Sequence, residues 1–278
     1  MSIAFYNGAF TEYERIAIPL SDRSVYFGDA IYDAAIGREG KIYLEDRHIS
    51  RFLGNAERLG MKPDLKRDEI SEILHEVIRR NVFDSYFIYF QLSRSSDERR
   101  HAFKEGDGTN LLVTIKKHTL PDRRRQLRLI TENDVRHHIC DVKTTCLLPA
   151  ALASAKAESL GYDEAIFLRD GIVTECAHSN IAIIKNGMLF THPRSPYILP
   201  GITRERLLFF CNKMHIPYRE EAFSRAELYS ADEVLVTSTT KLALRASEID
   251  NIPYKLRKNP LGEVLISALF DDYWNLME

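Results

Sequence analysis

The sequence has few cysteines, and they show no pattern of a metal site or a disulfide framework. Four of the 278 residues are cysteine, none forms a CxxC pair, and no paired histidines lie nearby at zinc-ligand spacing. No run of about 18 apolar residues occurs, which excludes a membrane-spanning helix. The first residues reach acidic and aromatic side chains at once, unlike a signal peptide. We therefore expect a cytoplasmic protein that binds no metal.

An excess of charge of either sign is also lacking. The chain has 38 Lys and Arg against 40 Asp and Glu, so its formal net charge is −2. This balance gives no support to a nucleic-acid-binding or membrane-surface protein, which usually concentrates positive charge. With 45% hydrophobic residues, 13 Tyr and 14 Phe, the composition excludes disorder. At about 100–200 residues per domain, the length predicts one large or two modest domains.

Common catalytic signatures are missing as well. The sequence contains no GxGxxG, GxxxxGK[ST], GxSxG or HExxH motif. Dinucleotide-binding, nucleotide-triphosphate, hydrolase-elbow and zinc-protease functions therefore have no support. Any chemistry must come from groups distributed along the chain.

Hydrophobic periodicity and turn residues predict helices and strands in both halves of the chain. In the first half we expect strands at 3–6, 86–92 and 111–115, a strand starting at 9, a hairpin over 32–43, and helices over 46–60 and 67–80. In the second half we expect strands at 126–131, 163–168, 172–174 and 234–236, a hairpin around Asn186-Gly187, and helices over 149–160, 202–214 and 261–276. This order predicts two α+β lobes rather than a regularly alternating parallel-sheet protein.

A polar stretch, KKHTLPDRRR at 116–125, marks the expected domain boundary because it contains a proline and a basic run. We expect an N-terminal α+β lobe over 1–117, a linker over 118–125 and a C-terminal lobe over 126–278. The five basic side chains of the stretch favour a solvated linker, with a phosphate site as the alternative.

Two polar segments could bind an anion. Gly201-Ile202-Thr203-Arg204 opens a helix, whose N-terminus offers unpaired N–H groups, although the pattern favours Thr203 as a simple helix cap. The run Thr237–Thr240 follows an apolar strand, and its hydroxyls would serve phosphate oxygens or local turn hydrogen bonds equally well.

Three further segments carry ionisable groups. Lys143 precedes small polar and then apolar residues, a setting for a desolvated reactive amine, although most lysines are simply exposed. Glu175 leaves an apolar strand at a turn. Its carboxylate could serve a functional site there, or it could be a simple surface or capping residue. Arg99 and His101 share a loop that could grip a carboxylate, or could be a solvated loop next to acidic neighbours.

Six segments in a fixed order support a more specific interpretation. They are FGDAIYD at 27–33, RHISR at 47–51, DVK at 141–143, VTE at 173–175 with SN at 179–180, LPGIT at 199–203, and TSTT at 237–240. From residue 3 to about 250 the chain resembles the class IV (fold type IV) pyridoxal-phosphate aminotransferases. The resemblance implies a two-lobed α+β fold, with a smaller N-terminal lobe and a larger C-terminal, cofactor-binding lobe that has a β-barrel-like core.

Within that class the sequence is most similar to the D-amino acid aminotransferases. The segment YFQLSR at 89–94, followed by Arg99-x-His101, resembles the family's carboxylate-binding loop. In the family this arginine and histidine work with a tyrosine, here Tyr32, across a dimer interface. The resemblance therefore implies a homodimer whose substrates are small amino acids and 2-oxo acids, with neither nucleic acid nor membrane as a partner.

The resemblance assigns roles to further residues. Lys143 forms the internal aldimine with pyridoxal 5'-phosphate and shuttles the substrate's Cα proton. Glu175 pairs with the pyridine nitrogen, and Glu164 is a carboxylate near the lysine. The cofactor phosphate is held by Arg51, Ile202, Thr203, Ser238 and Thr239.

Some positions depart from the family pattern. His178 and Cys176 replace a small hydroxyl residue and a glycine near the cofactor, Asp33 stands where glutamate is common, and Lys241 and Arg245 follow the hydroxyl run where uncharged residues are common. These changes bear on substrate range rather than on cofactor binding.

The sequence thus predicts transamination between a D-amino acid, such as D-alanine or D-glutamate, and a 2-oxo acid, such as 2-oxoglutarate or pyruvate. An aminodeoxychorismate lyase and an L-branched-chain aminotransferase are the alternatives that keep the cofactor. A catalytically inactive cofactor-binding protein or structural oligomer is a further alternative, which the presence of both Lys143 and Glu175 disfavours.

Overall fold

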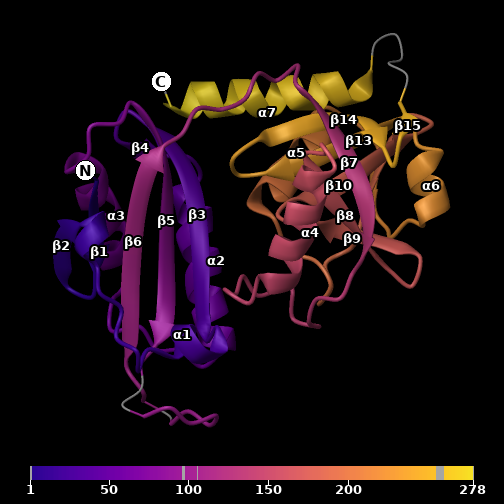
Figure 1. Cartoon of the computed structure of the whole chain (residues 1–278). Helices are drawn as coiled ribbons and strands as arrows, with labels where there is room; N and C mark the ends of the chain where they lie inside the picture. Colours follow the sequence, from indigo (N-terminus) through magenta and orange to yellow (C-terminus); the bar gives the residue numbers. More distant parts are fainter. Residues whose placement is uncertain (1, 96–97, 105, 255–259, 278) are drawn as a thin grey trace. The chain divides into compact units, whose positions relative to one another are not determined.

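The chain folds into two compact units (Figure 1). The computed structural model describes residues 2–95, 98–104, 106–254 and 260–277. Unit 1 comprises residues up to 119 together with 142–146 and Met277, and unit 2 comprises residues 120–141 together with 147–276. Each unit has its own sheet and its own hydrophobic core.

Unit 1 contains an antiparallel sheet of six strands in the order β2-β1-β6-β5-β3-β4. Its strands are β1 (Ile3–Tyr6), β2 (Ala9–Glu12), β3 (Ala30–Arg38), β4 (Lys41–Ile42), β5 (Ser85–Arg94) and β6 (Thr109–Lys117). Its helices are α1 (Arg23–Phe27), α2 (Glu45–Arg58) and α3 (Arg67–Arg79), with the short 3-10 helix η1 (Tyr13–Arg15). Helix α2 packs against β3, and α3 packs against β1, β6 and α2 (Figure 1).

Alternation of apolar side chains along β5 explains how the helices pack on this sheet. Its residues from Tyr86 to Phe90 are alternately buried and partly exposed, so one face of the strand carries the core. The ring of Phe90 meets that of Phe52 from α2 edge to face, at a centroid distance of 4.8 Å. The period of three and four that predicts α2 therefore marks the face that covers the sheet.

The segment 142–146 lies beside the N-terminal part of β3, where β4 does not reach. A single β-bridge joins Ile31 to Thr144, and the N–H of Thr145 donates to the carbonyl of Ala30 at 3.0 Å. Val142 belongs to the core of unit 1. Hence this segment packs with the N-terminal strands, whereas the sequence places it in the C-terminal lobe.

Unit 2 contains a mixed sheet of nine strands in the order β12-β11-β10-β13-β14-β7-β8-β9, with β15 added beside β14. Its strands are β7 (Gln126–Asn133), β8 (Glu164–Arg169), β9 (Ile172–Cys176), β10 (Asn180–Lys185), β11 (Met188–Thr191), β12 (Tyr218–Glu220), β13 (Glu233–Ser238), β14 (Leu242–Ile249) and β15 (Ile252–Pro253). Strand β9, the last in this order, also contacts β10. The sheet therefore curls back on itself, and the expected barrel-like core is confirmed.

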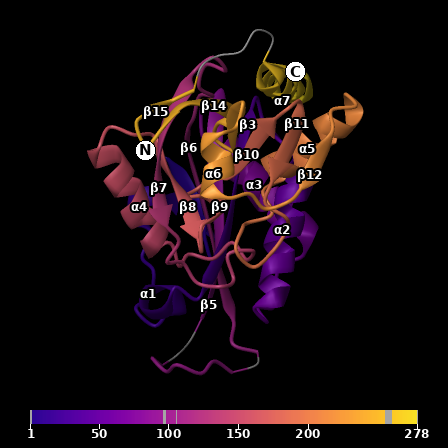
Figure 2. The ribbon, with the colours of Figure 1, turned by 90° about the vertical axis from the view of Figure 1, so that its right-hand side faces the viewer.

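In the described part of this unit, the sheet is accompanied by the helices α4 (Leu148–Ser159), α5 (Ile202–Lys213), α6 (Arg225–Tyr229) and α7 (Leu261–Met277). Helix α4 packs on β7 and β8 through alanines, whereas α5 packs on β13, so the two helices cover separate parts of the sheet (Figure 2). The α+β fold class predicted from the sequence is confirmed.

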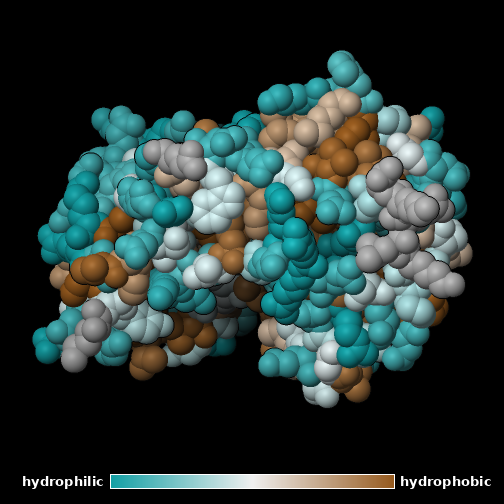
Figure 3. Space-filling view, turned by 90° about the horizontal axis from the view of Figure 1, so that it is seen from above, coloured by the Kyte–Doolittle hydropathy of each residue, from teal (hydrophilic) through white to brown (hydrophobic). Residues whose placement is uncertain are grey.

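The surface is mostly polar on the face drawn in Figure 3, where hydrophobic side chains gather in only a few places. Among the described helices, none is both long enough and apolar enough to cross a membrane. The described residues also contain no group of three or more His, Cys, Asp or Glu side chains arranged to hold a metal ion.

Candidate active site

Lys143 is fixed against β3 by its own backbone. The N–H of Tyr32 donates to the carbonyl of Lys143 at 2.9 Å, which continues the pairing between this segment and β3. The lysine side chain is partly buried, and its Nζ atom lies 4.2 Å from the centroid of the Tyr32 ring. The amine is thus held over an aromatic face rather than spread into solvent.

Arg51 is held by a buried carboxylate. Its Nε and Nη2 atoms donate to the two oxygens of Asp33 at 2.8 and 2.9 Å, and Asp33 is fully buried. Nδ1 of His48 lies 2.8 Å from the same carboxylate. Burial alone would raise the pKa of Asp33, but the charge of Arg51 and the hydrogen bonds from His48 and Arg51 lower it well below its usual range. A carboxylate that stays charged fixes the direction of the guanidinium.

His48 completes this arrangement without adding a positive charge. Burial lowers its pKa below the usual value, and the charges of Arg51 and Lys143 act in the same direction, against the raising effect of Asp33. At neutral pH the ring is therefore neutral, and it serves Asp33 as a hydrogen-bond donor.

The loop that carries Arg99 and His101 is attached to α1 by a buried arginine, Arg23. Its two Nη atoms donate to the backbone carbonyls of Arg100 at 2.6 Å and His101 at 2.9 Å. Its Nε atom donates to Asp29 at 2.7 Å, which neutralises the buried charge. Arg23 therefore positions this loop through its backbone and leaves the side chains of Arg99 and His101 exposed.

Aromatic rings give the exposed side chains of this loop a support. The guanidinium carbon of Arg99 lies 5.4 Å from the ring centroids of both Tyr26 and Phe27, and the His101 ring lies 5.4 Å from that of Phe27. Within the described part of one chain, no interaction joins Tyr32 to Arg99 or His101. The loop thus presents a cation supported by aromatic rings.

In unit 2, Glu175 at the end of β9 is surrounded by donors. One oxygen accepts from the side-chain amide of Asn180 at 2.9 Å and from the N–H of Leu199 at 3.0 Å. The other oxygen pairs with Arg136. Such an arrangement fixes the orientation of the carboxylate.

Arg136 had no recognisable signal in the sequence, yet it is the ionic partner of Glu175. Its Nε and Nη2 atoms also donate to Asp134, both at 2.9 Å, and only 10% of its side chain is exposed. Burial would lower the pKa of Arg136, but its hydrogen bonds to Asp134 and the charge of Glu175 raise it above the usual value. An arginine two residues after an aspartate at the end of a strand is too common a pattern to identify it.

Helix α5 begins without a side-chain cap. Its N-cap residue is Gly201, and Thr203 is the second residue of the helix, so the capping role that the sequence favours for Thr203 is wrong. A Cβ atom at Gly201 would lie 1.9 Å from Oδ1 of Asn180. Glycine is therefore required by the close approach of Asn180, and the first amides of α5 have no capping side chain.

The hydroxyl run forms the turn between β13 and β14. Ser238 pairs with Leu242 across this hairpin, and its Oγ atom lies 3.4 Å from Oγ1 of Thr240. Ser238 and Thr239 are partly exposed, and α5 packs against β13, which leads into the turn. Asn180, which approaches Gly201 at the start of α5, also pairs with Thr237 at the end of β13, so the hydroxyl turn follows a residue that is paired beside the start of α5.

Glu164 lies fully buried beneath two of the residues that depart from the family pattern. Its carboxylate accepts from Nζ of Lys241 at 2.7 Å and from the N–H of His178 at 2.9 Å. Nε2 of His178 lies 3.2 Å from the same Lys241 Nζ. Ser179 donates to Glu164 as well, at 3.0 Å. The two substitutions are thus linked, because both contact one buried carboxylate.

The structure brings some of the expected residues together, in separate groups within each unit. In unit 1, Lys143 and Tyr32 are in contact, and Arg51 lies on α2 above the adjacent residue of β3. In unit 2, one group contains Glu175 with the start of α5, and Glu164 and His178 form another contact. Sequence reasoning missed the residues that hold these groups and the Arg99 loop in place: Arg23, His48, Asp134 and Arg136.

Comparison with known proteins identifies the family. The amino-transferase class IV family matches residues 30–249. D-alanine aminotransferases of Staphylococcus epidermidis and Bacillus licheniformis are 33% and 32% identical to the chain, over 90% of both proteins in the first case, and over 88% of this chain and 87% of the relative in the second. The chain belongs to the class IV aminotransferases, which use pyridoxal phosphate.

A solved structure shows the same fold. The branched-chain aminotransferase of Thermoproteus uzoniensis, determined with norvaline, superposes with a TM-score of 0.89 at 23% identity, covering 97% of this chain and 93% of that protein. At this identity the likeness supports the fold and not the substrate.

The residues present fit the family's cofactor. An uncapped helix start and the hydroxyl turn supply donors of the kind that a phosphate group accepts. Glu175, fixed by Arg136 and Asn180, supplies the carboxylate that a protonated ring nitrogen needs. Lys143 supplies the amine.

Proposed function

We propose that the protein transfers the amino group of a D-amino acid, such as D-alanine or D-glutamate, to a 2-oxo acid, such as 2-oxoglutarate or pyruvate. The observation that carries this proposal is the identity of 31–33% with D-alanine aminotransferases over nearly the whole of both chains. The Arg99-x-His101 segment, which resembles the family's carboxylate-binding loop, supports it.

The proposed roles of the residues follow from the side chains described above. Bound pyridoxal phosphate supplies an electron sink for the carbanion that forms at the substrate's Cα. Lys143 would hold the cofactor's aldehyde carbon and then move the proton at Cα, because its amine is kept in place by the strand pairing beside Tyr32. Glu175 would keep the ring nitrogen protonated.

Phosphate and substrate binding would use separate groups. Arg51, the amides of Ile202 and Thr203, and the hydroxyls of Ser238 and Thr239 would hold the phosphate. Arg99 and His101 would hold the substrate carboxylate, with Tyr32, across the interface of a homodimer. The location in the cytoplasm remains a prediction from the sequence.

Replacement of Lys143 tests the proposal directly. Lys143→Ala should remove the visible absorbance of the purified protein and lower kcat by a factor of at least 10⁴, because a positioned amine that moves a proton contributes about 10²–10⁴ and covalent attachment of the cofactor adds to this. Lys117→Ala is a matched control, since Lys117 is an exposed lysine at the end of β6. Wild-type absorbance and turnover in Lys143→Ala would rule out the assignment.

The choice of amino donor separates the alternatives. The purified protein should transaminate D-alanine with 2-oxoglutarate at least tenfold faster than L-leucine, a difference of about 1.4 kcal/mol in transition-state binding. Preference for L-leucine would instead identify a branched-chain enzyme, and release of pyruvate from aminodeoxychorismate would identify a lyase. Absence of every activity in a cofactor-loaded protein would favour a structural role.

A further inference from the structure

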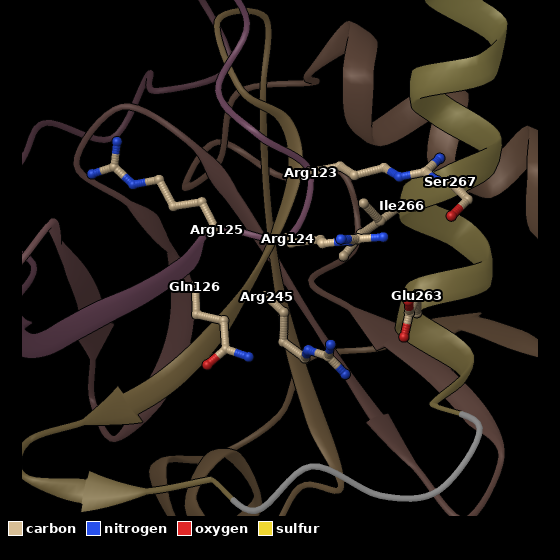
Figure 4. Close-up of a pocket in the computed structure, with 8 residues that line it drawn as sticks. All are labelled: Arg123, Arg124, Arg125, Gln126, Arg245, Glu263, Ile266 and Ser267. Atoms are coloured by element: carbon tan, nitrogen blue, oxygen red, sulfur yellow. The ribbon is translucent and has the colours of Figure 1, made fainter.

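The basic run that the sequence favours as a solvated linker lines a pocket of unit 2. The pocket has a volume of about 200 Å³ and lies where the start of β7, strand β14 and helix α7 meet (Figure 4). Its lining residues are Arg123, Arg124, Arg125, Gln126, Arg245, Glu263, Ile266 and Ser267. None of these residues belongs to the groups assigned above to the cofactor or the substrate.

The basic run has a defined conformation at this pocket. Asp122 begins a turn, in which its side chain accepts from the N–H of Arg124 at 2.8 Å and its carbonyl accepts from the N–H of Arg125 at 2.9 Å. The turn directs Arg123 and Arg124 toward α7, whereas Arg125 extends to the opposite side (Figure 4). The charge of Arg125 is also paired, because its guanidinium lies 2.6 Å from the carboxylate of Asp163.

The charges that face the pocket are unequal. Arg123 has a long contact of 3.6 Å with the exposed Asp271, and Arg124 has no ion-pair partner among the residues that the structure describes. The lining contains a single carboxylate, Glu263. An anion entering the pocket would therefore meet more positive than negative charge.

Arg245 gives the pocket an anchored cation. Only 14% of its side chain is exposed, and its Nη1 atom lies 3.2 Å from Glu233, which also accepts from the N–H of Gly262 at the start of α7. Its Nε atom is buried and has no hydrogen-bond partner within the described structure. A buried N–H without an acceptor is destabilising, so a bound oxygen atom there would remove a penalty.

We propose that this pocket binds a phosphate group, either as free inorganic phosphate or as the phosphate of a small monoester. Arginine guanidinium groups match the oxygen spacing of phosphate in a bidentate manner. The amide of Gln126 and the hydroxyl of Ser267 add neutral donors to the lining. The bound group bridges the start of β7 and helix α7, and it stabilises unit 2 by linkage.

Titration calorimetry of the cofactor-loaded enzyme, at constant ionic strength, tests the proposal with inorganic phosphate and with glycerol phosphate. Use of the loaded enzyme keeps the cofactor's own phosphate site filled. The wild type should bind at least one of the two probes saturably, and the probe with the lower Kd identifies free phosphate or the ester as the ligand. Binding should also raise the melting temperature. Absence of saturable binding of either probe at millimolar concentration would overturn the proposal.

Two variants that remove the same charge distinguish a specific phosphate site from non-specific electrostatic attraction. Arg124→Gln should raise the Kd by about tenfold, and Arg125→Gln, which removes the same charge from a side chain directed elsewhere, should change it by less than about twofold. Arg245→Lys keeps the charge but removes the Nε–H donor, and should raise the Kd by at least about threefold. Equal weakening by Arg124→Gln and Arg125→Gln would mean that only the field of the surface attracts the anion.

Discussion

Asp33 illustrates how a single residue organises one half of the candidate site. It is fully buried, yet the two donors of Arg51 and the ring of His48 keep it charged. Its pKa lies below the value of an unfolded chain, so the ion pair stabilises the fold at every pH above about 4. That stability is lost only as the pH falls through the lower, folded-state pKa.

Asp33→Asn should therefore be costly at neutral pH. An amide cannot neutralise Arg51, and removal of one partner of a buried ion pair costs about 3–5 kcal/mol of unfolding free energy. Asp64→Asn, at an exposed position of the same unit, should change it by less than about 0.5 kcal/mol. Urea unfolding at pH 7 and in acid gives the comparison, and the difference between wild type and Asp33→Asn should shrink in acid. A difference independent of pH would contradict the ionic explanation.

Among the elements, the long and strongly periodic ones were predictable from the sequence. Helices α2, α3 and α5 begin and end within two residues of their predicted bounds, because buried side chains recur on one face. Strand β14 was missed, since it contains a bulge and three partly exposed positions, so neither simple alternation nor a continuous apolar run marks it. Helix α6 is only five residues long, although its capping box of Ser224 and Glu227 was a readable signal.

The candidate site was predictable only where a motif carried it. The sequence placed Lys143, Glu175 and the start of α5 among its candidates. It gave no sign of Arg23 or Arg136, because the structural role of an isolated arginine depends on partners that are distant in the chain. Ion pairs of this kind depend on the folded topology and not on a local pattern.

The start of α5 offers a test at the scale of an element. Gly201→Ala should displace Asn180, which holds both Glu175 and the carbonyl of Leu199, and should lower the unfolding free energy by about 1–3 kcal/mol. Cofactor affinity, followed by absorbance, should fall as well. Gly54→Ala is the matched control, because a Cβ atom there has free space within α2 and should be neutral or slightly stabilising. Normal cofactor affinity in Gly201→Ala would separate this contact from cofactor binding.

At the scale of the whole molecule, the exposed apolar side chains are consistent with the proposed homodimer. Leu148 and Leu152 lie one turn apart on α4, with 70% and 63% of their surface exposed, and Leu147 precedes them. Apolar groups that cluster on a surface mark sites of protein association. A symmetric dimer would also allow the Arg99 loop of one chain to serve the lysine of the other.

Mixing two defective variants tests that exchange. Lys143→Ala lacks the amine, and Arg99→Ala should have a greatly raised KM for both substrates, so each alone should be nearly inactive at low substrate concentration. If the loop serves the partner, half of the randomly mixed dimers have one intact site of two, and activity should return to roughly a quarter of the wild-type value. Recovery should require unfolding and refolding of the mixture together. No recovery in dimers shown to be mixed would place both residues in the same chain's site.

The packing of residues 142–146 against β3 has a consequence for the order of folding. The chain leaves unit 1 after residue 119, returns for five residues, and leaves again, so the first unit is not finished when its first 119 residues have been synthesised. Until Lys143 and Thr145 emerge from the ribosome, the N–H of Tyr32 and the carbonyl of Ala30 lack the partners they have in the finished structure. Lys143 therefore arrives only after all the strands of the N-terminal unit have been synthesised. An N-terminal fragment cut at the linker would lack both this segment and the amine.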